Sequence, residues 1–391
     1  MKTLSIKLKV ILGVSTCLMV AAALLIGLVR GSYRRNVDMV ARNALETAIR
    51  SYENLKSDRA AVIEATTAVV VNVDSLRQTF IGQNRNELLE KTKPIFDELK
   101  KQGSAEHLLY LDVQGNAFLR MHNPKAFGDK VPASFLAKAM QTQTPVTGFD
   151  LVAAGFVIGG ARPYYDSASK LIGYVICGGP LDNFLATMKR QTSDDYKMVG
   201  FKKLVNEDTY HKTQQKLGLQ DRWAQFANVI TFSETSASIA NADYDSEAQN
   251  VPASGKLLGE ATIGDREYIR GVFPLTNALG QTTGGIFVRH DVTELYNGMQ
   301  RVQNLAIATI LVVLLVVSVM LFVILNKLVF ARLKQTMDTA TRVVGGDFER
   351  QIIPVSNDEV GKLEALLEQF RAIFVNVVNE LQQANDSNAR K

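Results

Sequence analysis

Two stretches of uncharged, mostly apolar residues divide the chain into three parts. Residues 10–29 carry no charge, and residues 305–325 are interrupted only by Thr309 and Ser318. Each stretch is long enough to cross roughly 30 Å of hydrocarbon as a helix, so both predict transmembrane helices. Outside them lie a short N-terminus (1–9), a middle block (31–303) and a C-terminal region that begins at residue 326.

The first apolar stretch has a second interpretation, a cleaved signal peptide. Its length exceeds the usual apolar core of such a peptide, and residues 28–32 lack a small-residue cleavage site, so we expect an uncleaved anchor. Positive residues flank the outer ends of both stretches, namely Lys2, Lys7, Lys9, Lys327, Arg332 and Lys334. Because positive residues favour the cytoplasmic side, we expect both termini inside a bacterial inner membrane and the middle block in the periplasm.

The middle block contains an internal repeat with a period of 111 residues. Pro163 and Gly173 recur as Pro274 and Gly284, and each copy reads as strand, polar turn, strand and amphipathic helix. The apolar helix positions match without a gap: Leu181 with Val292, Phe184 with Leu295, and Met188 with Met299. A strand hairpin precedes each copy. The pattern therefore predicts two tandem antiparallel-sheet modules, over residues 76–190 and 191–303.

An amphipathic stretch at residues 35–75 precedes the first module. Its apolar residues keep a spacing of three and four, which predicts a long helix rising from the first membrane segment. One face can pack on the sheets and another on a second chain. We expect a homodimer; the alternative is a helix that serves only its own sheets.

Two further apolar stripes follow the second membrane segment, and each repeats every three and four residues. The stripes are Phe330, Leu333, Met337, Ala340 and Val344, and then Val360, Leu363, Leu367, Phe370, Phe374, Val377 and Leu381. Such spacing is typical of short coiled-coil helices. The pair, with Gly346-Asp347 ending the first helix and Asp358-Glu359 opening the second, resembles a HAMP domain over residues 327–381. The resemblance implies signalling roles for Gly346, Asp347, Glu359, Leu363, Leu367, Phe370 and Phe374. Residues 382–391 read as a polar tail.

Composition excludes several classes of protein. The net charge of +5 in 391 residues is too small to indicate nucleic-acid binding. The two cysteines, Cys17 and Cys177, lie in a membrane segment and in a strand, which argues against a disulfide between them. We find no catalytic motif, no metal-ligand spacing and no cofactor signature, so we expect neither an enzyme nor a metal or cofactor protein. The letters Gly-Gly-Asp-Phe-Glu at 345–349 resemble a diguanylate cyclase signature, but too few residues follow for that α/β domain.

The middle block resembles the double Cache sensor domains of bacterial receptors, and within them the type-3 group. The resemblance rests on residues 110–129, 155–163 and 199–226. It implies an α+β fold of two PAS-like antiparallel-sheet modules on a long N-terminal helix, with two transmembrane helices and a C-terminal HAMP coiled coil. It also implies a receptor that senses an extracytoplasmic small molecule. The alternative is a membrane adaptor whose modules bind a partner protein.

Candidate ligand groups lie on the strands of the first module. Arg120 and His122 alternate on one strand, so they share a face and could hold a carboxylate, which suggests an organic anion. The other candidate pocket residues are Tyr110, Asp150, Arg162 and Tyr164. A solvated strand face is the alternative for all of them. For the output, the HAMP-like helices would act on a cytoplasmic signalling protein in trans, or on an output domain missing from this chain.

Overall fold

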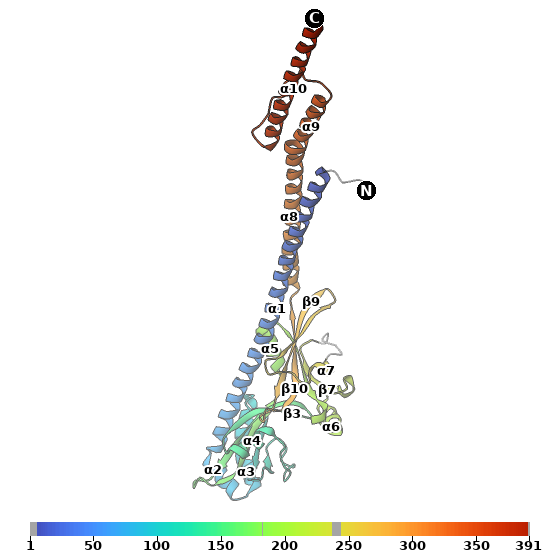
Figure 1. Cartoon of the computed structure of the whole chain (residues 1–391). Coiled ribbons are helices and arrows are strands. Elements are labelled where there is room, and N and C mark those ends of the chain that lie inside the picture. The colour runs from blue at the N-terminus through green and yellow to red at the C-terminus, as the bar shows by residue number, and fades with distance from the viewer. Residues whose placement is uncertain (1–5, 182, 237–243, 390–391) are drawn as a thin grey trace. The chain divides into compact units, whose positions relative to one another are not determined.

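The computed structural model describes residues 6–181, 183–236 and 244–389, which divide into two compact units (Figure 1). One unit comprises residues 35–297, and the other combines residues 1–34 with residues 298–391. Among the described residues, two helical segments, Leu8–Val71 and Thr293–Val344, are long and apolar enough to cross a membrane. The first is α1, Ile6–Val71, an unbroken helix of 66 residues.

The unit of residues 35–297 contains two five-stranded antiparallel sheets, each with an equivalent strand order. The first module has the order β2-β1-β5-β4-β3, and the second has β7-β6-β10-β9-β8. The first module contains α2 (Asp74–Ile81), α3 (Arg85–Lys101), β1 (His107–Leu111), β2 (Ala117–Arg120), α4 (Ser134–Thr142), β3 (Val146–Val152), β4 (Gly155–Tyr165) and β5 (Leu171–Pro180). The second follows α5 (Phe184–Thr192) and contains β6 (Asp195–Phe201), α6 (Glu207–Leu217), β7 (Val229–Glu234), α7 (Tyr244–Glu247), β8 (Lys256–Ile263), β9 (Arg266–Thr276) and β10 (Thr282–Asp291). The predicted α+β fold with tandem sheet modules is confirmed.

The repeat predicted from the sequence holds at the level of single residues. Both ends of β4 and β5 recur 111 residues later as the ends of β9 and β10. The turns match too: the Asp166 carboxylate and the Asn277 amide oxygen each accept two backbone N–H groups of their own turn. Glycine recurs because a Cβ on Gly173 or Gly284 would lie 2.1 or 2.0 Å from a carbonyl oxygen of the neighbouring strand.

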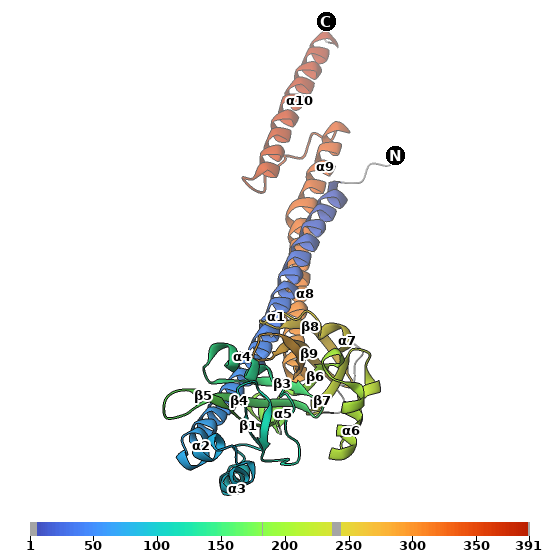
Figure 2. The same cartoon turned by 90° about the horizontal axis from the view of Figure 1, so that it is seen from below.

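Both faces of the first sheet are covered, each by different helices (Figure 2). Leu108 and Tyr110 of β1 pack in a core with α1, α2 and α3, whereas Leu109 and Leu111 pack in a core with α4. The alternation follows from the two-residue period of a strand. A third core joins the modules: Tyr52 of α1 contacts Phe149, Phe184 and Phe273, with ring centroids 5.4–5.9 Å apart.

The other unit contains the helices that follow the second apolar stretch. Helix α8 (Thr293–Ile324) passes through a π-helical stretch (Leu325–Phe330) into α9 (Ala331–Val344), and α10 (Glu359–Ala389) follows an extended connector. The Arg332 guanidinium lies 2.9 Å from the Asp358 carboxylate and so ties α9 to the start of α10. Two helices joined by a connector agree with the two predicted stripes.

Candidate functional site

A cavity of about 230 Å³ lies in the first module, on the face of the sheet that α4 covers. It is mostly apolar. Its lining residues are His107, Leu109, His122, Val131, Pro132, Ala133, Phe135, Asp150, Val152, Val157, Ile158, Gly159, Ile176, Gly178 and Gly179. Strands β1, β3, β4 and β5 form one wall, and α4 with the preceding loop forms the other.

Two histidines sit side by side in this lining. The ring centroids of His107 and His122 are 4.4 Å apart, in an edge-to-face arrangement with an interplanar angle of 72°. Burial lowers the pKa of both imidazoles; for His122, the nearby His107 and Arg120 add to the effect and bring the pKa to about 4. Both rings are therefore neutral at pH 7, and each offers one hydrogen-bond donor and one acceptor.

Asp150 lines the same cavity but already has a structural partner. Its carboxylate accepts the backbone N–H of Ser134 at 2.8 Å, which satisfies an N-terminal donor of α4. Burial raises the pKa of Asp150, against the hydrogen bonds at the helix start, which lower it. The carboxylate thus fixes α4 over the cavity.

Arg120 lies outside the lining of the cavity. Its guanidinium forms a two-bond ion pair with Asp129, at 2.5 and 2.8 Å, and also donates to the carbonyl of Ala126 at 3.0 Å. These contacts hold the loop between β2 and α4. Arg120 and His122, which were predicted to act together, therefore have different surroundings. His122 lines the cavity, whereas Arg120 holds the neighbouring loop.

The other three predicted ligand residues lie on the opposite face of the sheet. Tyr110 is fully buried in the core with α2 and α3, and its hydroxyl lies 3.1 Å from the Thr92 hydroxyl. Arg162 and Tyr164 of β4 line a second cavity on that face. The six predicted residues therefore do not form one site.

His107 and Phe135 belong to the cavity and were not among the predicted residues. A signal for His107 was present in the β1–β2 hairpin, where Leu109 pairs with Arg120. Continuing this antiparallel register by two residues places His107 opposite His122. Phe135 gave no comparable signal because it lies on a helix outside the sheet.

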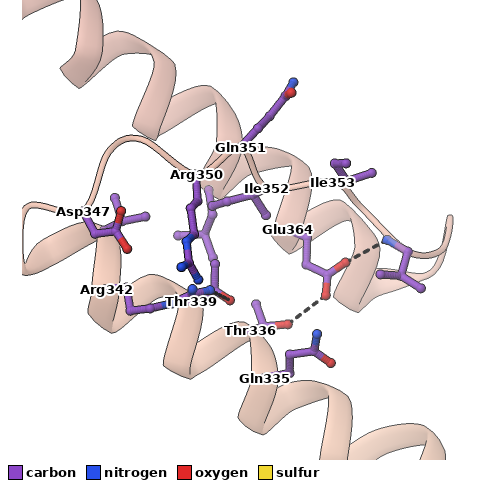
Figure 3. A pocket seen from close by; sticks show the side chains of 13 residues that line it. Gln335, Thr336, Thr339, Arg342, Asp347, Arg350, Gln351, Ile352, Ile353 and Glu364 are labelled. Carbon is purple, nitrogen blue, oxygen red and sulfur yellow. Dashed lines mark hydrogen bonds between the residues drawn. The ribbon is translucent and has the colours of Figure 1, made fainter.

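The C-terminal helices enclose a separate cavity of about 170 Å³ beside their connector (Figure 3). Figure 3 shows the buried Glu364 turned toward Thr336, whose hydroxyl donates to it at 3.1 Å, while the Val355 N–H donates at 3.0 Å. Of the residues predicted for signalling, Asp347 and Leu367 line this cavity. Gly346 follows α9 with a φ of 93°, and Glu359 begins α10. Leu363, Phe370 and Phe374 are 43%, 62% and 45% exposed in this single chain.

Comparison with known proteins gives one family match. Residues 41–296 match the model of a family described as the double sensory domain of two-component sensor kinases. No curated protein sequence matches the chain.

Several solved structures are similar at low sequence identity. The periplasmic domain of Vibrio cholerae LuxQ has 12% identity and a TM-score of 0.39, covering 63% of this chain and 99% of that one. The isoleucine-bound sensory domain of the Campylobacter jejuni chemoreceptor Tlp3 has 11% identity and a TM-score of 0.41, covering 68% and 96%. The sensor domain of Escherichia coli DcuS has 16% identity and a TM-score of 0.29, covering 34% and 97%.

Proposed function

Since the chain belongs to the family of double sensory domains of two-component sensor kinases, we propose that it is a transmembrane receptor for a small molecule. The observation that carries the proposal is the cavity under α4, which lies between the sheet and that helix and is lined by apolar side chains, two imidazoles and the Asp150 carboxylate. Ligand sites in proteins usually have this composition, an apolar wall with a few polar groups that fix orientation.

The membrane arrangement supports a sensor on the outer side. The apolar parts of α1 and α8 are the two candidate spans, and the residues 35–297 lie between them in sequence. The positive residues that flank the outer ends of the spans favour the cytoplasm. We place residues 35–297 in the periplasm of a bacterial inner membrane.

The lining of the cavity favours a small, largely apolar ligand with one polar group. The volume of about 230 Å³ is below the roughly 300–1,000 Å³ of most ligand pockets. Neutral imidazoles of His107 and His122 can hydrogen-bond to a hydroxyl, a carbonyl or an amine. An organic anion would instead need a proton on one imidazole, because Arg120 lies outside the lining of the cavity.

A direct contact links the cavity to the second module. At the start of α4, the Ser134 hydroxyl accepts the backbone N–H of Ala278 at 3.1 Å, and Lys138 donates to the Ala278 carbonyl at 3.0 Å. Ala278 lies in the turn between β9 and β10, and β10 leads into α8. A ligand that shifts α4 would therefore move the strand that continues into the second span.

The C-terminal helices would pass this movement to a cytoplasmic signalling protein. The exposed stripe of Leu363, Phe370 and Phe374 supports a HAMP-like parallel pairing with a second copy, because burying such side chains is worth roughly 1.5–3 kcal/mol each. Ligand binding would change how the two copies pack along this stripe.

One experiment tests binding and relay together, on the full chain in lipid nanodiscs. The protein used carries two substitutions, Cys17→Ser and Phe374→Cys. The natural cysteine that remains, Cys177, is fully buried and so does not form crosslinks. A thermal-shift screen of small metabolites supplies the ligand. We expect the ligand to raise the melting temperature and to change the rate of disulfide crosslinking at position 374.

A cavity-filling variant provides the contrast. Val157→Phe should abolish both responses, because Val157 lines the cavity. Val113→Phe makes the same change at a residue that is 40% exposed outside the lining, so it should keep both. A ligand that acts equally on Val157→Phe would place binding elsewhere, and a melting shift with unchanged crosslinking would contradict the relay.

A further inference from the structure

A second cavity, of about 300 Å³, lies on the face of the first sheet that α1, α2 and α3 cover, opposite to the cavity under α4. It is bounded by the junction of α1 and α2, by the end of α4 and by the last residues of β4. The lining residues are Val71, Asn72, Arg77, Gln143, Pro145, Arg162, Pro163, Tyr164, Tyr165 and Asp166. Its walls are thus more polar than those of the cavity under α4.

Three buried donors of this lining have no hydrogen-bond partner within the described part of the chain. They are the hydroxyl of Tyr164 and the Nε atoms of Arg77 and Arg162. Tyr164 as a residue is only 1% exposed. A buried polar group without a partner costs free energy, and an acceptor bound beside these three donors would recover it.

The two guanidiniums are only weakly neutralised. Arg162 faces Glu64 at 3.6 Å, too long for a hydrogen bond, and the Glu64 side chain is 59% exposed. Arg77 pairs with Asp74, which is 82% exposed, and donates a further hydrogen bond to the Val71 carbonyl. Exposed carboxylates are screened by solvent and contribute little.

The remaining groups of the lining do not compete for the donors. Asp166 is occupied by two backbone N–H groups of its own turn, at 2.9 and 2.8 Å. Burial raises the pKa of Tyr164, with the nearby Arg77 opposing the shift, so its hydroxyl remains a donor at neutral pH. Two guanidiniums and one hydroxyl therefore line a cavity whose carboxylate, Asp166, is engaged by its own turn; the other acceptors of the lining are neutral groups.

We infer that this cavity is a second ligand site, one that binds a small organic or inorganic oxyanion between Arg162, Arg77 and Tyr164. Arginine suits the role because its planar fork matches the oxygens of a carboxylate or a phosphate. The anion bridges the end of α1 to β4. It gives the receptor an input through α1, separate from the cavity under α4.

Isothermal titration of the full chain in nanodiscs tests the site, with acetate, succinate and phosphate as probes and succinamide as the neutral analogue of succinate. We expect at least one anion to bind and succinamide not to bind. Acetate or succinate binding alone identifies a carboxylate site, and phosphate binding alone a phosphate site. Failure of all three anions, or equal binding of succinamide, would overturn the inference.

Variants then locate the bound anion. Arg162→Gln should weaken binding roughly tenfold to a hundredfold, and Tyr164→Phe, which keeps the packing, roughly twofold to tenfold. Lys170→Gln removes an exposed positive charge of the same module outside the cavity and should leave affinity unchanged. Arg162→Lys is the fallback if the Gln variant does not fold, and it should still weaken binding.

A variant from the other side of the cavity sharpens the assignment. Arg77→Gln, on α2, should also weaken anion binding, because Arg77 belongs to the same lining. Retention of full affinity in Arg162→Gln or in Arg77→Gln would overturn the assignment.

Discussion

In the first module Gly159 of β4 pairs with Gly178 of β5, and both glycines line the cavity under α4. In the second module the same two strand positions, 111 residues later, hold Arg270 and Arg289, which also pair. The sheets are otherwise equivalent in strand order and turn. Removing two side chains from the middle of a sheet leaves room for a ligand, whereas two arginines fill the same place.

The arginines are part of a buried charged layer on that face of the second sheet. Arg289 is 5% exposed, lies 2.8 Å from the Asp195 carboxylate and stacks on the Tyr268 ring. Lys197, 1% exposed, lies 3.1 Å from Glu234, which also pairs with Arg222 at 2.9 Å. One copy of the sheet thus leaves a cavity at this position, and the other fills it with buried charged side chains.

The largest effect that this comparison predicts is on the second module. Glu234→Gln removes the carboxylate between two cations, one of them fully buried, and should lower the free energy of unfolding by about 3 kcal/mol. The control is Glu260→Gln, on an exposed position of β8. Thermal melting measures both. Equal melting temperatures would mean that the charged layer does not hold the module together.

The next largest effect is expected from a substitution in the glycine pair of the first module, Gly159 and Gly178. A Cβ at Gly159 would lie 2.4 Å from the ring of Phe135, so Gly159→Ala must displace α4. We expect a loss of about 1–3 kcal/mol, as for other overpacked cores, together with loss of ligand binding. Gly179→Ala is the matched control for stability, since its Cβ would meet no atom closer than 3.6 Å. A stable, ligand-binding Gly159→Ala would contradict the role given to the pair.

The smallest predicted effect is the pH dependence of stability, which has opposite signs in the two modules. Burial lowers the pKa of His122, so its contribution to stability is present above pH 6.5 and is lost as pH falls toward about 4. Hydrogen bonding to Asp194, at 2.6 Å, raises the pKa of His290, although burial opposes it. Its contribution is present below pH 6.5 and is lost as pH rises through the raised pKa.

Melting curves of His122→Asn and His290→Asn across pH 4 to 9 separate the two signs. The first variant should lose less stability than the parent on acidification. The second should fall furthest below the parent at acid pH and approach it at alkaline pH. Parallel pH profiles for the two variants would contradict the assignment.

The sequence predicted the sheets better than the ligand residues, and particular residues show why. The repeat was visible because Pro163, Gly173 and their copies mark strand and turn positions that depend on local backbone geometry. Arg120 ends β2, whereas His122, predicted on the same strand, lies in a bend just after it. The partner of Arg120, however, is Asp129 in an irregular loop whose path no periodicity encodes.

The second difficulty was to predict on which face of the sheet each side chain lies. Both sides of the first sheet are buried, so Tyr110 and Leu109 are equally apolar in pattern although they face α3 and the cavity respectively. Tyr164 and Asp150 were grouped for the same reason and lie on opposite faces. The register of the β1–β2 hairpin carried the missing information for His107.

The shared turn of the repeat has a practical consequence for protein engineering. In the second module the turn at Asn277 is docked on α4 through Ala278, whereas residues 167–170 of its copy in the first module are exposed. Exposed turn tips with small residues accept insertions with little effect on the fold. A small fluorescent tag inserted after Ala168 would therefore leave the first module folded, whereas the same tag after Ala278 would break the contact between that turn and α4.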